Sequence, residues 1–158
     1  MTGDGADTIF GNDADNMLYG MRGNDYIFGD PGGANTIDGG DGHDTLEGGN
    51  QGDTISGGRG ADTIKGGNGD DLIDGGIGND HLYGNDDADT FRFDGMFGND
   101  VVHDFLVGTD TIEIIGYTAG DLTLTATGGN TLVEVLGVSD TIEILGSVLT
   151  DFSDFVFG

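Results

Sequence analysis

The most regular stretch of the chain, residues 57–74, reads GGRGADTIK-GGNGDDLID, which is one nine-residue pattern twice in direct succession. The pattern extends in both directions, so that ten such units run from Thr2 to Arg92. One unit, around Pro31, is one residue longer than the others. An internal repeat of this kind is typical of a solenoid, in which each unit stacks on its neighbours and cannot fold alone.

Two positions of the unit hardly vary. The eighth residue is always large and apolar: Ile9, Leu18, Ile27, Ile37, Leu46, Ile55, Ile64, Ile73, Leu82 and Phe91. The sixth residue is always Asp or Asn: Asp7, Asn16, Asp25, Asn35, Asp44, Asp53, Asp62, Asp71, Asp80 and Asp89. A disordered Gly-rich tract has no reason to keep two such columns, so the pattern predicts an ordered fold.

The remaining positions predict the shape of each unit. Position one is Gly in nine of the ten units, and glycine permits the tight backbone of a turn. We expect the first six residues to form a turn and the last three to form a short strand with the eighth side chain inward. Strands on alternating sides would give two facing sheets and five coils. The sequence therefore predicts an all-β fold, a parallel β-roll (a two-sheet solenoid) over residues 2–92.

The composition restricts what the chain can bind. Asp and Glu number 30 and Lys and Arg number 4, which gives a formal charge of −26 over 158 residues. So charged a chain, with 34 glycines, should stay unfolded in plain water unless a multivalent cation neutralises it. The same charge excludes nucleic acid as a partner. We expect a monomer with no disulfide, since the chain has no Cys, and with neither a transmembrane segment nor a cleaved signal peptide at its start.

Position six places a carboxylate at the end of each turn, and neighbouring coils bring two of them together. Calcium between them, completed by turn carbonyls, fits better than magnesium, which demands a tighter octahedron. The predicted side-chain ligands are Asp7, Asp25, Asn35, Asp44, Asp53, Asp62, Asp71, Asp80, Asp89, and Asp100 from a worn eleventh unit at 95–103. The predicted carbonyl ligands are Gly3, Gly5, Gly23, Gly40, Gly42, Gly49, Gly58, Gly60, Gly67, Gly69, Gly76 and Gly78. We expect about eight calcium ions.

The odd-numbered and even-numbered units differ at these positions. Every odd unit has Asp at position six and Gly at position four, whereas the even units include Asn16 and Asn35 at position six. Asn keeps one carbonyl ligand but loses the charge, and a Cβ at position four, as in Asp87, resists a left-handed backbone. We therefore expect the odd column to bind calcium more strongly than the first sites of the even column.

This pattern resembles the G-G-x-G-x-D-x-U-x nonapeptide of the RTX, or haemolysin-type calcium-binding, family over residues 2–92. The resemblance implies a β-roll with calcium between its coils, secretion by a type I apparatus, and folding triggered by extracellular calcium. Such modules usually belong to larger secreted toxins, proteases, lipases, polysaccharide epimerases or surface proteins. The implied role is structural and not catalytic: a calcium-binding module that supports the secretion and stability of a larger protein.

The C-terminal part, residues 93–158, has a different composition. Residues 104–112 resemble the D-F-x-x-G-x-D-x-I stretch that follows the repeats in secreted RTX proteases. Residues 112–157 alternate apolar and polar side chains and predict antiparallel strands, joined at 128–130, that cap the roll. The ending, residues 154–157, resembles a type I secretion tail, and it also fits a last strand that packs on the cap.

Two alternatives to a purely structural role stay open. Arg59, Lys65 and Arg92 could form a sparse basic strip for an anionic polysaccharide, as in epimerase-associated modules, or the chain could be a segment of a surface adhesin. The three histidines, His43, His81 and His103, stand apart in the sequence, with no H-E-x-x-H motif. His43 and His81 occupy variable positions of the repeat and are interpreted as solvated bystanders, not as zinc ligands.

Overall fold

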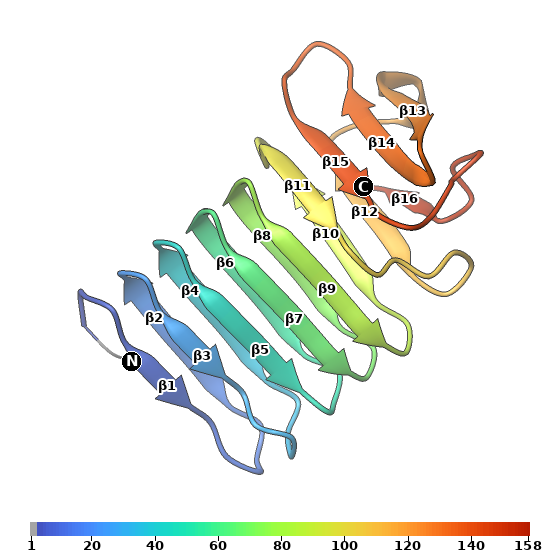
Figure 1. Cartoon of the computed structure of the whole chain (residues 1–158). Coiled ribbons are helices and arrows are strands. Elements are labelled where there is room, and N and C mark those ends of the chain that lie inside the picture. The colour runs from blue at the N-terminus through green and yellow to red at the C-terminus, as the bar shows by residue number, and fades with distance from the viewer. Residues whose placement is uncertain (1–2) are drawn as a thin grey trace.

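The computed structural model describes residues 3–158 and contains two sheets that lie face to face along the axis of the roll (Figure 1). The nine-stranded sheet contains β1 (Thr8–Phe10), β3 (Tyr26–Phe28), β5 (Thr45–Gly49), β7 (Thr63–Asn68), β9 (His81–Asp86), β11 (Asn99–Val102), β15 (Thr141–Ile144), β14 (Asn130–Val135) and β13 (Leu122–Thr127). The seven-stranded sheet contains β16 (Phe155–Phe157), β12 (Thr111–Ile115), β10 (Thr90–Asp94), β8 (Leu72–Gly78), β6 (Thr54–Gly60), β4 (Thr36–Asp41) and β2 (Met17–Arg22). Odd units therefore build one sheet and even units the other, and the predicted all-β parallel roll is confirmed.

The stacking register keeps equivalent positions of the repeat side by side. Ile27 pairs with Leu46, and Leu46 pairs with Ile64, so that eighth position lies on eighth position from coil to coil. From Ile27 to Phe91 every side chain of this column is buried, at 0–1 % exposure. Ile9 and Leu18 are only partly buried because they lie in the first coil, which has no coil beneath it among the described residues.

Most strands are longer than the three residues that the sequence predicts. Only β1 and β3 in the repeat region have three residues, whereas β6 and β8 have seven and run on into the first glycines of the next unit. These glycines pair in register, Gly40 with Gly58 and Gly58 with Gly76. The prediction of a six-residue turn was therefore wrong: backbone groups at positions one to three continue the ladder between coils before the chain turns.

The roll does not end at Arg92. Strand β12 pairs in parallel with β10, and β16 with β12, while β11 pairs with β9 and β15 with β11. Within residues 3–158 each sheet thus has seven parallel strands, compared with the five coils that were predicted. The short sequence D-T-I recurs at 110–112 and 140–142, and each copy starts one of these strands with the Asp-x-apolar end of the repeat.

The antiparallel cap is smaller than predicted. Among residues 3–158, only the pairing of β13 with β14, joined at 128–129, and that of β14 with β15 are antiparallel. The core is thicker here, because Phe93, Phe97 and Phe105 are buried beside the apolar column. The chain ends in β16, where Phe155 is buried, so the tail lies in a strand. No helix among residues 3–158 is long and apolar enough to cross a membrane.

Candidate metal centre

The sixth-position side chains form two hydrogen-bonded ladders along the roll. In the odd column, from Asp25 to Asp100, one carboxylate oxygen of each Asp accepts a hydrogen bond from the backbone N–H of the Asp one coil earlier. The first such bond joins Asp7 N–H to Asp25 Oδ1 at 2.7 Å, and the last joins Asp80 N–H to Asp100 Oδ1 at 2.9 Å. The even column is built alike and ends where Asp89 N–H donates to Asp110 Oδ1 at 3.1 Å. Each side chain is therefore fixed through one of its two polar atoms.

The second carboxylate oxygen is buried and has no hydrogen-bond partner. This holds for the Oδ2 atoms of Asp7, Asp25, Asp44, Asp53, Asp62, Asp71, Asp80, Asp89 and Asp100. A buried polar atom without a partner costs about 1–3 kcal/mol, and a charged one costs more. Nine repetitions of this penalty in register are consistent with sites that a cation or a proton completes.

Backbone carbonyls lie against these unpartnered oxygens. A Cβ placed on Gly57 would lie 2.5 Å from the Gly75 carbonyl oxygen and 2.6 Å from Asp62 Oδ2. The same convergence occurs beside Gly20, Gly39 and Gly48. Position one must therefore be Gly, because any side chain would fill the space between a carboxylate and the carbonyl of the next coil. The sequence signalled this through nine glycines in ten units, yet the first-position carbonyls were missing from the predicted ligands.

The predicted carbonyl ligands at positions two and four stack in the same way. Those with a left-handed backbone are Gly5, Gly23, Gly40, Gly42, Gly49, Gly58, Gly60, Gly67, Gly69 and Gly76. A side chain on Gly58 would contact the Gly40 carbonyl, and one on Gly78 would contact the Gly60 carbonyl. Gly3, in the first coil, has no such neighbour within 4 Å. The turn carbonyls therefore follow one another from coil to coil beside the carboxylates.

Burial raises the pKa of the column carboxyl groups from Asp44 to Asp110. The pKa of Asp62 is raised to about 6, those of Asp80 and Asp89 to about 7, and those of Asp71 and Asp100 to about 8. The loss of hydration is the main cause, and the repulsion from neighbouring carboxylates in the column adds to it. Without a cation, Asp71 and Asp100 in the folded roll therefore favour the protonated form at pH 7, whereas Asp80 and Asp89 are close to half protonated and Asp62 is mostly ionised.

The side-chain amides of the two even-column asparagines have hydrogen-bond partners within the protein. The amide nitrogen of Asn35 donates to the Gly33 carbonyl at 2.8 Å and to the Gly48 carbonyl at 3.3 Å. The amide nitrogen of Asn16 donates to the Asn12 carbonyl at 2.9 Å and to the Ala14 carbonyl. A polar N–H here lies where the other units present a carboxylate oxygen, so the first even coils have less need of a cation.

The donor atoms fit a hard cation. Among residues 3–158 no three His, Cys, Asp or Glu side chains come together as a metal cluster. An ion in either column would therefore be shared between one or two carboxylates and several backbone carbonyls. Calcium takes six to eight oxygen ligands in such flexible shells, whereas zinc prefers nitrogen and sulfur.

The three basic residues proposed for polysaccharide binding do not form one strip. Lys65 lies on β7 in the nine-stranded sheet, whereas Arg59 and Arg92 lie on β6 and β10 in the seven-stranded sheet. Each is close to a carboxylate: Lys65 Nζ is 3.2 Å from Glu47, Arg59 Nε is 3.8 Å from Asp41, and Arg92 Nε is 3.5 Å from Glu113. Their charges are therefore largely compensated within the protein.

The sequence matches the profile of a family described as RTX calcium-binding nonapeptide repeat (4 copies), over residues 1–33, 32–64, 47–82, 56–91 and 65–102. The chain belongs to this family. RTX repeats bind calcium, which agrees with the oxygen-only donor set of the two columns. No curated protein sequence matches the chain.

A solved structure shares this fold. The extracellular lipase LipA from Serratia marcescens matches 99% of this RTX chain with a TM-score of 0.56 and 20% identity. The chain spans 39% of the length of that lipase, and the similarity shows a shared fold. The AlgE6R3 subunit of the Azotobacter vinelandii mannuronan C5-epimerase also matches, with 22% identity over 99% of this chain and 80% of that subunit, at a TM-score of 0.29.

Proposed function

We propose that this chain is a non-catalytic folding module that calcium converts from an unfolded chain into the β-roll. The observation that supports this most directly is the set of nine buried Oδ2 atoms without partners, repeated in register with turn carbonyls. A formal charge of −26 also opposes compaction until cations neutralise it. Because the ligands come together only in the roll, the free energy of calcium binding is then also free energy of folding.

The proposed ions lie in the intervals between successive carboxylates of a column. The odd column, from Asp7 to Asp100, has five such intervals, and the even column has three between Asp53 and Asp110. Eight intervals agree with the expectation of about eight ions. The proposed ligands are the unpartnered Oδ2 atoms and the carbonyls of positions one, two and four. Asn35, a predicted ligand, lies outside these eight intervals, because its amide nitrogen donates to two turn carbonyls and its Oδ1 accepts the N–H of Asn16. Asp110 ends the last even interval, although its Oδ2 already accepts the N–H of Leu106.

The setting that suits such a module is secretion as part of a larger protein. In a calcium-poor cytoplasm the chain would stay extended, which suits passage through a type I secretion apparatus. Outside the cell, sites of this class have dissociation constants on the order of 10⁻⁴–10⁻³ M, so that extracellular calcium would fold the module. The roll would then stabilise the protein to which it is attached.

An anionic polysaccharide remains a second candidate ligand, although the ion pairs of Arg59, Lys65 and Arg92 do not favour it. Titration of the calcium-loaded protein with acidic oligosaccharides, and with the Lys65→Gln variant, would detect such binding. Heat exchange that depends on Lys65 would support it.

Circular dichroism tests the leading proposal. In excess chelator the spectrum should be that of an unfolded chain, and added calcium should produce a β spectrum in one cooperative transition. Magnesium at the same concentration should do so far less well, because it keeps its water and demands octahedral geometry. A β spectrum in chelator that calcium leaves unchanged would refute calcium-dependent folding.

A further inference from the structure

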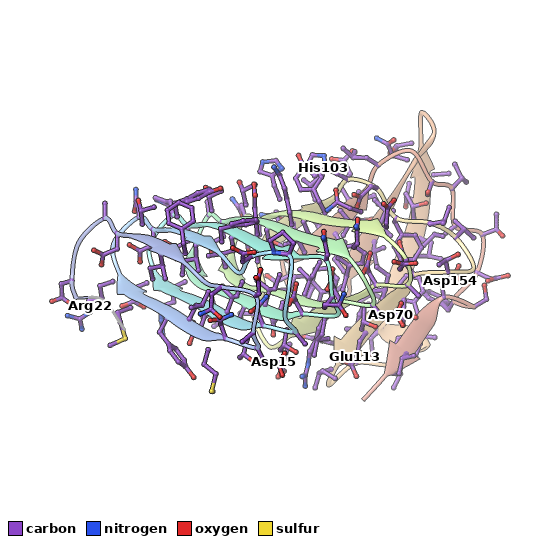
Figure 2. All side chains as sticks on the ribbon, turned by 90° about the horizontal axis from the view of Figure 1, so that it is seen from below. Asp15, Arg22, Asp70, His103, Glu113 and Asp154 are labelled. Atoms are coloured by element: carbon purple, nitrogen blue, oxygen red, sulfur yellow. The ribbon has the colours of Figure 1, made fainter. Side chains whose placement is uncertain are left out.

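Two histidines that stand 22 residues apart in the sequence meet on the outer face of the nine-stranded sheet. His81 Nδ1 lies 2.8 Å from His103 Nε2. His81 begins β9, and His103 follows β11, the neighbouring strand. Figure 2 shows His103 on the outside of the roll, on the side opposite Glu113. The expectation that these two histidines are isolated from each other was therefore wrong.

The surroundings hold the His103 ring in place. The ring of Tyr83 stacks on it with centroids 4.2 Å apart and an angle of 6° between the planes. His103 is half-buried, and its pKa is lowered by that burial and by the neighbouring His81. A neutral imidazole keeps the lone pair that a metal ion needs.

Two carboxylates give the pair a field that attracts cations. Asp104 and Glu143 both act on the charge of His103. Each is fixed by the protein, since Asp104 accepts hydrogen bonds from Gly84 N–H and Asn85 N–H at 3.0 and 3.1 Å, and Glu143 accepts one from Asn130 at 3.2 Å. A divalent ion between the imidazoles would therefore meet a negative potential without displacing a positive residue.

We propose that His81 Nδ1 and His103 Nε2 bind one divalent transition-metal ion such as zinc, with water in the remaining positions. Imidazole nitrogen suits zinc and copper and does not suit calcium, so the site is chemically separate from the two carboxylate columns. Zinc–nitrogen bonds of about 2.0–2.1 Å at a tetrahedral angle need the two nitrogens roughly 3.3 Å apart. The exposed His81 ring has to move by about 0.5 Å and to rotate so that both lone pairs face the ion, and the proton of the hydrogen bond between the rings has to leave the facing nitrogen.

The site has a consequence for folding. Its two ligands lie on different coils, so they come together only when the roll has formed through β11. An ion that binds the folded chain and not the unfolded chain stabilises the fold. Zinc would thus strengthen the C-terminal part of the calcium-loaded roll, where β9 joins β11.

The test uses the full chain saturated with calcium, so that the columns do not compete for zinc. Zinc sulfate is titrated into the protein by calorimetry, and nitrogen NMR of the imidazole rings reports which atoms it binds. His81→Asn and His103→Gln keep a polar group near the Nδ1 and Nε2 positions and can preserve the cross-strand hydrogen bond, but amides are poor zinc ligands. His43→Asn is the matched control, because His43 Nδ1 accepts a hydrogen bond from Ala61 N–H and has no histidine beside it.

We expect one zinc ion per chain, with His81 Nδ1 and His103 Nε2 shifted in the NMR spectrum. Both pair variants should weaken zinc binding by more than about tenfold, because loss of even a second-shell partner of a metal ligand costs 10–100-fold. The His43 variant should bind zinc as the wild type does. Zinc binding that is absent, or that is equal in all three variants, would overturn the proposal and would leave calcium-dependent folding untouched.

Discussion

The odd and even columns have the same backbone geometry and different ways of satisfying it. From Asp7 to Asp100 the odd column has a carboxylate in every coil, and each leaves its Oδ2 without a partner. The even column starts with Asn16 and Asn35, whose amide nitrogens donate to turn carbonyls, and only from Asp53 onward does it resemble the odd column. The second polar atom of the position-six side chain therefore decides whether a coil has an unpartnered buried atom: the amide nitrogen of Asn finds hydrogen-bond acceptors, and the Oδ2 atom of Asp finds no donor.

The comparison indicates that an amide nitrogen can take the place of a cation in a coil, whereas an ionised carboxylate leaves its buried Oδ2 without a partner. An amide and a protonated carboxyl group have nearly the same shape, and both present an N–H or O–H donor to the carbonyl of the next coil. An ionised carboxylate instead places one more hydrogen-bond acceptor beside the backbone carbonyl oxygens, where no donor is available. Calcium, a proton and an amide hydrogen are therefore three solutions to one local problem.

Acidification should have the largest effect on a calcium-free chain. The pKa values of Asp62, Asp71 and Asp80 in the folded roll are raised to about 6, 8 and 7 from 3.8. The folded state then holds more protons than the unfolded state between about pH 4 and pH 8, so its stability falls as pH rises through this window. In chelator, the chain should gain β structure on going from pH 8 to pH 5, as measured by circular dichroism.

Screening of the overall charge is the competing explanation, and salt separates the two. Sodium chloride at pH 8 weakens repulsion between exposed carboxylates but gives no proton to Oδ2. If 1 M salt at pH 8 restored as much β structure as pH 5 does, the raised pKa values of the columns would not be the cause.

Removal of one odd-column carboxylate should come next in size. Asp44 accepts the N–H of Asp25, and its own N–H donates to Asp62, so Asp44→Ala disturbs the intervals on both sides. The lost acceptor alone leaves a buried N–H unsatisfied, at about 1–3 kcal/mol. At a fixed calcium concentration within the transition, the folding equilibrium constant should fall by roughly tenfold or more, since about 1.4 kcal/mol is a factor of ten. The calcium midpoint of folding, followed by circular dichroism, should therefore rise.

Asn16→Ala is the matched change in the even column. It removes a half-buried amide at the open end of the roll, where no carboxylate is involved, and the calcium midpoint should shift much less. Equal shifts for the two variants would mean that the columns do not differ in their calcium requirement.

Replacing Asn35 of the even column by Asp should have a moderate effect: it should destabilise the calcium-free fold and add a calcium site. Asn35→Asp removes the donors to the Gly33 and Gly48 carbonyls and adds a charge beside Asp53. The calcium-free chain should become harder to fold, while calorimetry should count one more calcium ion per chain at saturation. Asn16→Asp, at the end of the column, should add none; an unchanged count for Asn35→Asp would show that the backbone there cannot hold an ion.

The repeat made most of this predictable. A fixed spacing of nine residues, with an apolar eighth position and an acidic sixth, determined which side chains are buried and which stack. The side assignment of odd and even units followed from the alternation of strands. Asp100 was predicted to continue the odd column, and the structure places it there, because the worn unit at 95–103 keeps its Asp-x-apolar ending.

Features of the fold that lie outside the nine-residue pattern were not predicted from the sequence. Strands β12, β15 and β16 keep the roll going after long irregular insertions, and only the recurring D-T-I at 110–112 and 140–142 marked two of them. His81 and His103 meet because of the register in which β9 pairs with β11. The coil between these strands has 20 residues, two more than the regular spacing of 18. Local insertions of this kind change which side chains become neighbours, and a repeat pattern cannot report them.

The smallest effect concerns position four, where the even column has a side chain in a conformation that the odd column reserves for glycine. Asp87 has φ 80°, whereas its counterparts Gly23 and Gly60 are glycines at φ 129° and 135°. Asp87→Gly should relieve about 1 kcal/mol of left-handed strain, and the loss of the exposed hydrogen bond from Gly69 N–H and the freer unfolded chain should offset part of it. Asp86→Gly removes the same charge next door, at a residue without positive φ, and so gives the cost of the change without the relief. In urea unfolding at saturating calcium, the Asp87 variant should be more stable than the Asp86 variant by up to about 1 kcal/mol. The reverse order would show that the Asp87 side chain contributes more through its hydrogen bond to the even turn than its backbone strain costs.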